Sequence, residues 1–491
     1  MVHGFDNNKY LKIQSENIKK RIAQFNDKLY LEFGGKLSDD THASRVLPGF
    51  EPDSKLQMLM QLRDEAEIVL VISAIDVERN KIRGDLGITY DEDVLRLNEE
   101  FSKIGLMVSS VVITHYNGQA SADAYRHRLE REGIKVYNHY TIEGYPNDVA
   151  LIESDEGFGK NDYIETSRPL VIVTAPGPGS GKMAVCLSQL YHEHKRGNKA
   201  GYAKFETFPV WNLPLKHPIN LAYEAATADL DDVNMIDSLH LEAYGEIAVT
   251  YNRDLEIFPV LNNIFESIYG ENPYKSPTDM GVNMIGYCIS DEEVCSNAAR
   301  EEIIRRYYTA LCNLAVTGNN ENEVNKISLI MKQAKLTTSY RKTTIAAKER
   351  KELTGVATAA IELNDGKIIT SRTSSLLGPS AALIVNATKY LAGIPHKVKL
   401  IPEEYIEPIQ KTKVEYLHGQ NPRLHTDEIL VAMSLLSKKD ENCRNALAQL
   451  PKLKGCQVHS TVMLTDVDQK VFKKLGVGLT CDPVKKINRI K

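Results

Sequence analysis

Short apolar runs alternate with amphipathic stretches along the first part of the chain, from about residue 28 to residue 206. Stretches such as 91–104 and 120–132 carry apolar residues at helical spacing, with acidic residues near their starts and basic residues or glycine near their ends. This alternation predicts a doubly wound, mostly parallel sheet with helices on both faces. The predicted strands are 29–33, 68–75, 109–114, 134–140, 170–174 and 200–205.

The alternation stops after residue 206. Residues 208–218 are aromatic and proline-containing, and they follow neither the helical nor the strand period, which is typical of a functional loop. Two helical patterns then follow, one starting at a capping-box sequence at 290–293 and one at 321–335. We interpret the region from about 270 to 345 as helical.

A second α/β pattern begins at residue 355. Two strand-like runs, 356–363 and 367–372, flank Asp365 and Gly366, which predicts a hairpin, and the alanine-rich stretch 378–393 predicts a helix packed on it. In shape this hairpin and helix resemble the core of the cytidine-deaminase-like fold. The sequence thus predicts a P-loop-like α/β domain at 1–269, a helical domain at 270–345 and a C-terminal α/β domain at 346–491.

Composition narrows the class of protein. A chain of 491 residues is too long for a single hydrophobic core, and its net charge of -5 lacks the basic field that nucleic-acid binding requires. The 7 cysteines contain no CxxC pair, which favours reduced thiols, and no apolar run is long enough to span a bilayer. We therefore expect a cytoplasmic protein with no nucleic-acid or membrane partner. We also expect a homo-oligomer, although the sequence does not fix the oligomeric state.

A glycine-rich loop between a predicted strand and a predicted helix carries the clearest chemistry. Its sequence is Gly177-Pro178-Gly179-Ser180-Gly181-Lys182. Glycines let backbone amides approach a phosphate closely, the following helix start adds free N–H groups, and Lys182 adds a positive charge. We predict that Gly177, Gly179, Ser180, Gly181 and Lys182 bind the phosphate of ATP or of another phosphorylated small molecule.

The loop departs from the Walker A pattern in two places. Pro176 stands where the first glycine belongs, and Met183 stands where a magnesium-binding Ser or Thr belongs. Methionine does not coordinate magnesium, so this argues against ordinary NTP hydrolysis and leaves the metal requirement open. A tight strand-to-helix turn without any ligand is the alternative interpretation.

Other candidates follow predicted strands. Asp76 comes after the strand 68–75 and is a candidate Walker-B-like carboxylate, although a helix cap or an ion pair with Arg79 or Lys81 explains it equally well. Beyond the strand 200–205 lies a segment rich in acidic residues and histidine. The sequence-based candidates for catalysis are Asp76, Glu206 and Glu224, and Lys36 and Arg45 are added to the loop as candidate ligand contacts.

Two metal chemistries lack their motifs. A zinc peptidase helix needs HExxH, but the nearest candidate, His192-Glu193-His194-Lys195-Arg196, has arginine where the second histidine belongs. A zinc-dependent deaminase needs HxE and PCxxC, and neither occurs. The residues therefore support neither reaction.

Several motifs together resemble one uncharacterised bacterial family, domain of unknown function 1846. They are 33–36, 42–50, 83–87, 175–182 and 222–229, and the likeness spans essentially the whole chain. Members sometimes carry the label of ATP-dependent zinc peptidase. The resemblance implies a multidomain α/β architecture and no particular reaction or catalytic residue.

Two hypotheses of different classes follow. The leading one is an enzyme that holds a nucleotide or phosphorylated metabolite at the loop, with Asp76 or Glu206 as metal ligand or base and the 208–242 segment contacting a second substrate. The alternative is a non-catalytic regulator or assembly protein in which the phosphate ligand stabilises an oligomer.

Overall fold

A computed structural model describes residues 3–25, 28–37, 40–83, 86–145, 147–230 and 232–484. The chain divides into two compact units. The first, here the N-terminal unit, contains residues 2–224 and 232–299, and the second, here the C-terminal unit, contains residues 225–231 and 300–491. Both units are therefore discontinuous in sequence.

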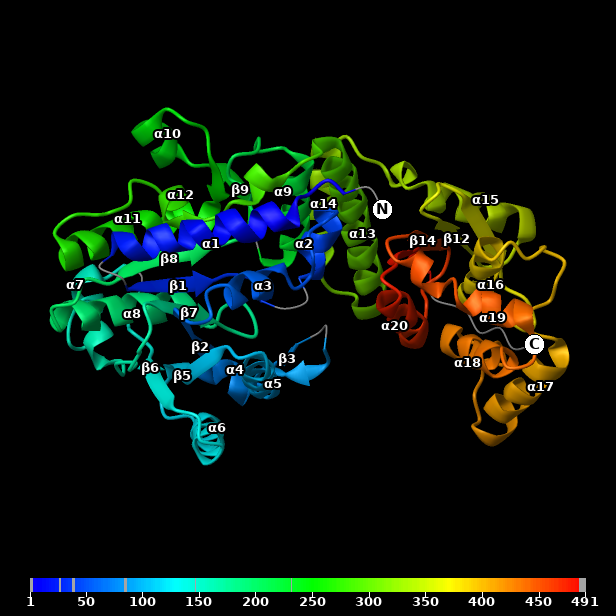
Figure 1. Ribbon diagram of the computed structural model, residues 1–491, viewed down its shortest axis with the longest axis horizontal. Helices are drawn as coiled ribbons and strands as arrows, with labels where there is room; N and C mark the ends of the chain where they lie inside the picture. Colours follow the sequence, from blue (N-terminus) through cyan, green and yellow to red (C-terminus); the bar gives the residue numbers. More distant parts are fainter. Residues whose placement is uncertain are drawn as a thin grey trace. The chain divides into compact units, whose positions relative to one another are not determined.

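A seven-stranded parallel sheet forms the centre of the N-terminal unit, in the order β11-β8-β1-β7-β2-β5-β6 (Figure 1). This confirms the predicted fold class. Every residue of β1, β2 and β7 is buried, as expected for central strands covered on both faces. The strands are β1 (Leu29–Phe33), β2 (Ala66–Ser73), β5 (Met107–Tyr116), β6 (Val136–Tyr140), β7 (Leu170–Thr174), β8 (Gly201–Phe205) and β11 (Gly281–Val282).

Helices connect these strands on both faces of the sheet. Helix α5 follows β2 and leads outward to β5, whereas α8 follows β7 and leads in the opposite direction to β8. Because parallel crossovers are right-handed, α5 and α8 cover opposite faces. The helices of this part are α1 (Asn7–Gln24), α2 (Thr41–Val46), α3 (Ser54–Met60), α4 (Ala74–Glu78), α5 (Tyr90–Lys103), α6 (Ala120–Arg131), α7 (Val149–Ile152), α8 (Lys182–Lys195), α9 (Pro218–Ala226), α10 (Ser238–Tyr244), α11 (Asn252–Tyr269) and α12 (Pro277–Met280).

Smaller elements complete the N-terminal unit. The short antiparallel pairs are β3 (Ile82–Arg83) with β4 (Ile88–Thr89) and β9 (Asn234–Ile236) with β10 (Val249–Tyr251). No described helix of the chain combines the length and the apolar character needed to cross a membrane.

The C-terminal unit combines helices with a four-stranded mixed sheet in the order β13-β12-β14-β15. Strand β12 pairs antiparallel with β13 and β14, and β14 pairs parallel with β15. Ile361, Leu383, Val458 and Phe472 pack together in its core. The strands are β12 (Thr358–Glu362), β13 (Ile368–Arg372), β14 (Gln457–Ser460) and β15 (Gly478–Cys481), and the helices are α13 (Glu292–Thr317, which starts in the N-terminal unit), α14 (Glu321–Gln333), α15 (Lys342–Thr354), α16 (Pro379–Leu391), α17 (Glu403–Lys411), α18 (Thr426–Leu436), α19 (Glu441–Leu447) and α20 (Asp466–Lys474).

The predicted hairpin and the helical middle are present, with local differences. Residues 281–282 lie inside the region interpreted as helical, but they form the edge strand β11. A two-residue strand leaves no periodicity in the sequence from which it could be predicted. At the start of α13 the amide of Val294 bonds to Asp291, the residue after Ser290. Residues 84 and 85 of the motif at 83–87 lie outside the described residues. The division into three domains stays a prediction.

Candidate functional site

The carboxyl ends of the parallel strands bring most candidate residues to one edge of the sheet. Gly34 to Lys36 follow β1, Asp76 follows β2, the glycine-rich loop follows β7, and Glu206 follows β8. Strands β1 and β7 are neighbours in the sheet. After β1 the chain crosses to β2, and after β7 it crosses in the opposite direction to β8. Open α/β sheets bind ligands at such a switch point, outside the carboxyl ends of the strands.

The glycine-rich loop has the predicted strand, turn and helix context. It leaves β7 at Thr174 and enters α8 at Lys182. Gly179 and Gly181 have φ angles of 74° and 85°, which L side chains rarely adopt, and Gly181 is the N-cap of α8. A Cβ on Gly177 would lie 2.3 Å from the hydroxyl of Tyr90, so packing against α5 already requires glycine there.

Ser180 anchors the loop to the end of β5. Its carbonyl oxygen accepts a 2.6 Å hydrogen bond from the Thr114 hydroxyl. The Ser180 side chain is buried, with the residue only 4% exposed, and its hydroxyl has no hydrogen-bond partner among the described residues. Within the described part of the chain, the Lys182 side chain forms neither a hydrogen bond nor an ion pair. The loop therefore holds a buried hydroxyl and a cation that the described residues do not satisfy.

The backbone amides of the loop are also unengaged. Val185 donates to the Gly181 carbonyl, which is the first bond of α8. The N–H groups of Gly179 and Gly181, and the first N–H groups of α8, meet no acceptor among the described residues. They form a set of donors at the positive end of the helix dipole.

Asp76 lies in helix α4, because β2 ends at Ser73 and not at residue 75 as predicted. Its carboxylate forms an ion pair with Lys81 at 3.2 Å. The Lys81 ammonium lies 4.9 Å from the ring centroid of Tyr90, the residue whose hydroxyl borders Gly177. Asp76 is thus connected to the loop through Lys81 and Tyr90.

Glu206 belongs to a second cluster at the same edge, at the end of β8. Lys204 contacts Glu206 at 2.8 Å and both carboxylate oxygens of Asp254 at 2.6 and 2.8 Å. A Cβ on Gly34 would lie 3.6 Å from the Glu206 side chain, so the end of β1 borders this cluster. The Lys204 ammonium therefore forms ion pairs with two carboxylates, those of Glu206 and Asp254.

The protonation of Glu206 is unusual for a carboxylic acid. Burial raises its pKa to about 7; Lys204 opposes the rise, whereas Asp254 and Glu32 add to it. Lys204 itself is held charged, because the nearby carboxylates outweigh the cost of burial and raise its pKa. A carboxyl group that titrates near neutral pH is suited to proton transfer.

Asp76 and Glu206 follow strands that stand three strand spacings apart, about 14 Å. No hydrogen bond, ion pair or shared cation among the described residues joins the two carboxylates. Glu224 lies in α9, where burial raises its pKa and the amide of Asn234 opposes the rise. Lys36 is exposed after β1, and Arg45 is half-buried in α2.

Sequence reasoning missed three neighbours of the site. Thr114 and Tyr90 hold the loop by contacts from other elements, and Asp254 reaches Lys204 from α11 across a separation of 50 residues. A carboxylate distant in sequence leaves no local signal. The apolar run before Thr114 was the one available hint, since the end of a parallel strand belongs to the same edge.

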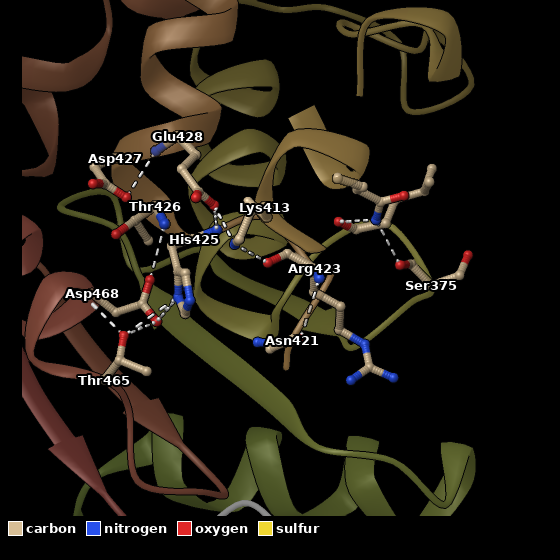
Figure 2. Close-up of polar contacts among 12 residues, drawn as sticks. Ser375, Lys413, Asn421, Arg423, His425, Thr426, Asp427, Glu428, Thr465 and Asp468 are labelled. Carbon is tan, nitrogen blue, oxygen red and sulfur yellow. Dashed lines mark hydrogen bonds and ion pairs between the residues drawn. The ribbon is translucent and has the colours of Figure 1, made fainter. Parts of the chain in front are cut away.

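A separate polar network lies in the C-terminal unit, at the start of α18 (Figure 2). Buried Asp468 accepts hydrogen bonds from the Thr426 amide at 2.9 Å and the Thr465 hydroxyl at 2.9 Å, and its carboxylate lies 3.2 Å from His425 Nδ1. Burial opposes ionisation, but these bonds lower the pKa of Asp468 to about 2. The hydrogen bonds of Asp468 attach α20 to the start of α18. The buried charge of Asp468 therefore has a structural role.

Metal ligation finds little support among the described residues. They contain no group of three or more His, Cys, Asp or Glu side chains arranged to hold an ion. His192 contacts the carbonyl of Asn161 at 2.8 Å, and Glu193 is fully buried and accepts from Tyr30 at 2.9 Å and Asn198 at 2.8 Å. Both side chains are thus engaged in hydrogen bonds within the protein.

Comparison with known proteins shows that two models of one family together match nearly the whole chain. A family model described as "Domain of unknown function DUF1846, N-terminal" matches residues 3–335, and its C-terminal counterpart matches residues 339–489. A UPF0371 protein of Streptococcus sanguinis (strain SK36) is 54% identical over 487 residues, covering 99% of both chains. A UPF0371 protein of Streptococcus pyogenes serotype M5 is 55% identical over 481 residues, covering 98% of this chain and 97% of that one. These names state no activity.

Proposed function

The chain belongs to the DUF1846 family, and we propose that it binds the phosphoryl group of a small phosphorylated ligand at the loop 177–182. The observation that carries the proposal is the unengaged donor set of this loop. Its amides and the buried Ser180 hydroxyl have no acceptor among the described residues. A turn that served structure alone would be expected to satisfy such a buried group within the protein.

The charges around the loop favour an anion. Lys182 and the N-terminal end of α8 are positive, and the carboxylate of Asp76 is paired with Lys81. A phosphoryl group would accept bonds from the amides and the Ser180 hydroxyl, and Lys182 would supply a mobile charge. Nucleotides and phosphorylated metabolites both carry this group.

Glu206 is the candidate for proton transfer in the same ligand. It follows β8, two strand spacings from β7, which is about 10 Å. A ligand with its phosphate at the loop would thus bring a group some 10 Å away to a carboxyl group that titrates near pH 7. The two roles give an enzyme acting on a phosphorylated small molecule.

The test is thermal stabilisation of the full chain by inorganic phosphate, nucleotides and sugar phosphates. A compound that raises the melting temperature of the wild type and not of Lys182→Ala supports the proposal. Glu206→Gln is the matched variant, because it should retain binding and lose turnover of that compound. Equal shifts in the wild type and Lys182→Ala would remove the loop as the site. Binding accompanied by a change of oligomeric mass, with no product, would favour the regulator or assembly protein.

A further inference from the structure

His115 stands beside the loop in a conformation that the local sequence does not favour. Its φ angle is 51°, in the left-handed region that non-glycine residues seldom occupy. The pairing of β5 with β6 also shifts register between Ile113 and Tyr116, so His115 lies within a bulge. Bulges and left-handed residues concentrate near functional sites, because they redirect one side chain at a cost in stability.

The Ser73 hydroxyl indicates which nitrogen of the ring carries the proton. The Ser73 hydroxyl lies 3.2 Å from His115 Nδ1 and accepts from the Ile75 amide, so its single hydrogen is available for Nδ1. No other acceptor for this buried hydroxyl is present in the described part of the chain. Nδ1 is therefore the acceptor, and in the neutral ring the proton sits on Nε2.

Thr114 connects the ring to the loop. Its hydroxyl lies 3.3 Å from Nδ1 but directs its hydrogen to the Ser180 carbonyl at 2.6 Å. Burial lowers the pKa of His115, with Asp76 opposing, so the ring is neutral at pH 7. Nε2 makes no hydrogen bond with the described residues and is not among their buried polar atoms.

We propose that His115 is a ligand-binding residue of the phosphate site, donating its Nε2 proton to an oxygen of a tetrahedral oxyanion. The inference rests on the proposed function of the loop. A neutral donor stabilises a phosphoryl oxygen without taking a proton from it, so His115 is an anion contact and not the base. A site built from donors suits a fully deprotonated oxyanion, such as sulfate or the dianion of a phosphate monoester, and binds inorganic phosphate, which keeps a proton at pH 7, no more tightly than sulfate.

The test compares four proteins: wild type, Lys182→Ala, His115→Asn and Ser73→Ala. Asparagine tolerates the left-handed backbone and places an amide near the position of Nδ1, but it lacks Nε2. Affinities for inorganic phosphate and for sulfate are measured by calorimetry at pH 7. His115→Asn should weaken both by about tenfold, the loss of one hydrogen bond to a charged group. Nitrogen NMR of labelled histidine should report the Nε2–H form in the wild type and lose that preference in Ser73→Ala.

The outcomes separate the inference from the proposed function. If the wild type binds neither anion, or Lys182→Ala binds as tightly as the wild type, the proposed function fails. If Lys182→Ala loses binding while His115→Asn keeps the affinity of the wild type, only the role of His115 fails. An Nδ1–H ring in the wild type, or a preference for phosphate over sulfate greater than tenfold, also overturns the inference.

Discussion

Replacing Glu206 with glutamine should change how the stability of the N-terminal unit depends on pH. In the folded chain the pKa of Glu206 is raised from 4.5 to about 7, chiefly by burial. A carboxyl group with a raised folded-state pKa destabilises the fold once it ionises. Its cost is absent below pH 4.5, grows as the pH rises from 4.5 to 7, and is complete above pH 7.

The size of the effect follows from the difference between the two pKa values. Each pKa unit corresponds to about 1.4 kcal/mol, so ionising Glu206 in the folded state costs at most about 3 kcal/mol. The side chain is 23% exposed, which leaves most of that cost in place. Glutamine has the same shape, carries no charge and still accepts a hydrogen bond from Lys204. Glu206→Gln should therefore exceed the wild type in stability by less than about 1 kcal/mol at pH 5 and by about 3 kcal/mol at pH 8.

Urea denaturation at pH 5, 6, 7 and 8 measures this difference. Glu256→Gln is the matched control, because Glu256 is an exposed carboxylate on α11, the helix that carries Asp254. Its stability should follow the wild type at every pH. The reasoning is refuted if the free energies of unfolding of Glu206→Gln and the wild type run parallel from pH 5 to pH 8, because the carboxyl group would then titrate alike in both states.

Two further predictions concern the buried groups of the fold. Asp468→Asn should destabilise the C-terminal unit by about 2 kcal/mol at pH 7, because the pKa of Asp468 falls from 3.8 to about 2 on folding. The difference in stability should vanish as the pH falls toward 2. Urea titrations of both proteins at neutral and acid pH can check this. All cysteines other than half-buried Cys312 are buried, and burial raises the pKa of the Cys312 thiol to about 11. The native chain should therefore react with a thiol reagent far more slowly than the urea-unfolded chain. Rapid labelling of the native protein would contradict this.

Residues close together in sequence were the predictable part of the site. The apolar run before Ala175 and the helical spacing after Lys182 were enough to predict the strand, the turn and the helix around the loop. The role of Gly177 at the ligand stays a prediction. The structure adds a second reason for glycine there, because the Tyr90 hydroxyl lies where its Cβ would be.

Contacts between distant elements were not predictable. The pattern placed Asp76 after a strand, but the strand ends at Ser73, whose hydroxyl starts helix α4, so Asp76 belongs to a helical turn. The raised pKa of Glu206 depends on Lys204 and on Asp254, which comes from another helix. His115 gave no signal, because neither a left-handed backbone nor a bulge has a sequence signature for histidine.

The discontinuous C-terminal unit has a consequence for synthesis on the ribosome. Residues 225–231 belong to that unit but are translated before residues 232–299, which belong to the other one. A nascent chain that ends near residue 299 therefore holds every residue of the N-terminal unit, together with one segment whose own unit does not yet exist. For the same reason, one proteolytic cut between residues 299 and 300 leaves each fragment with an incomplete or an extra part, so the two units cannot be separated cleanly by a single cleavage.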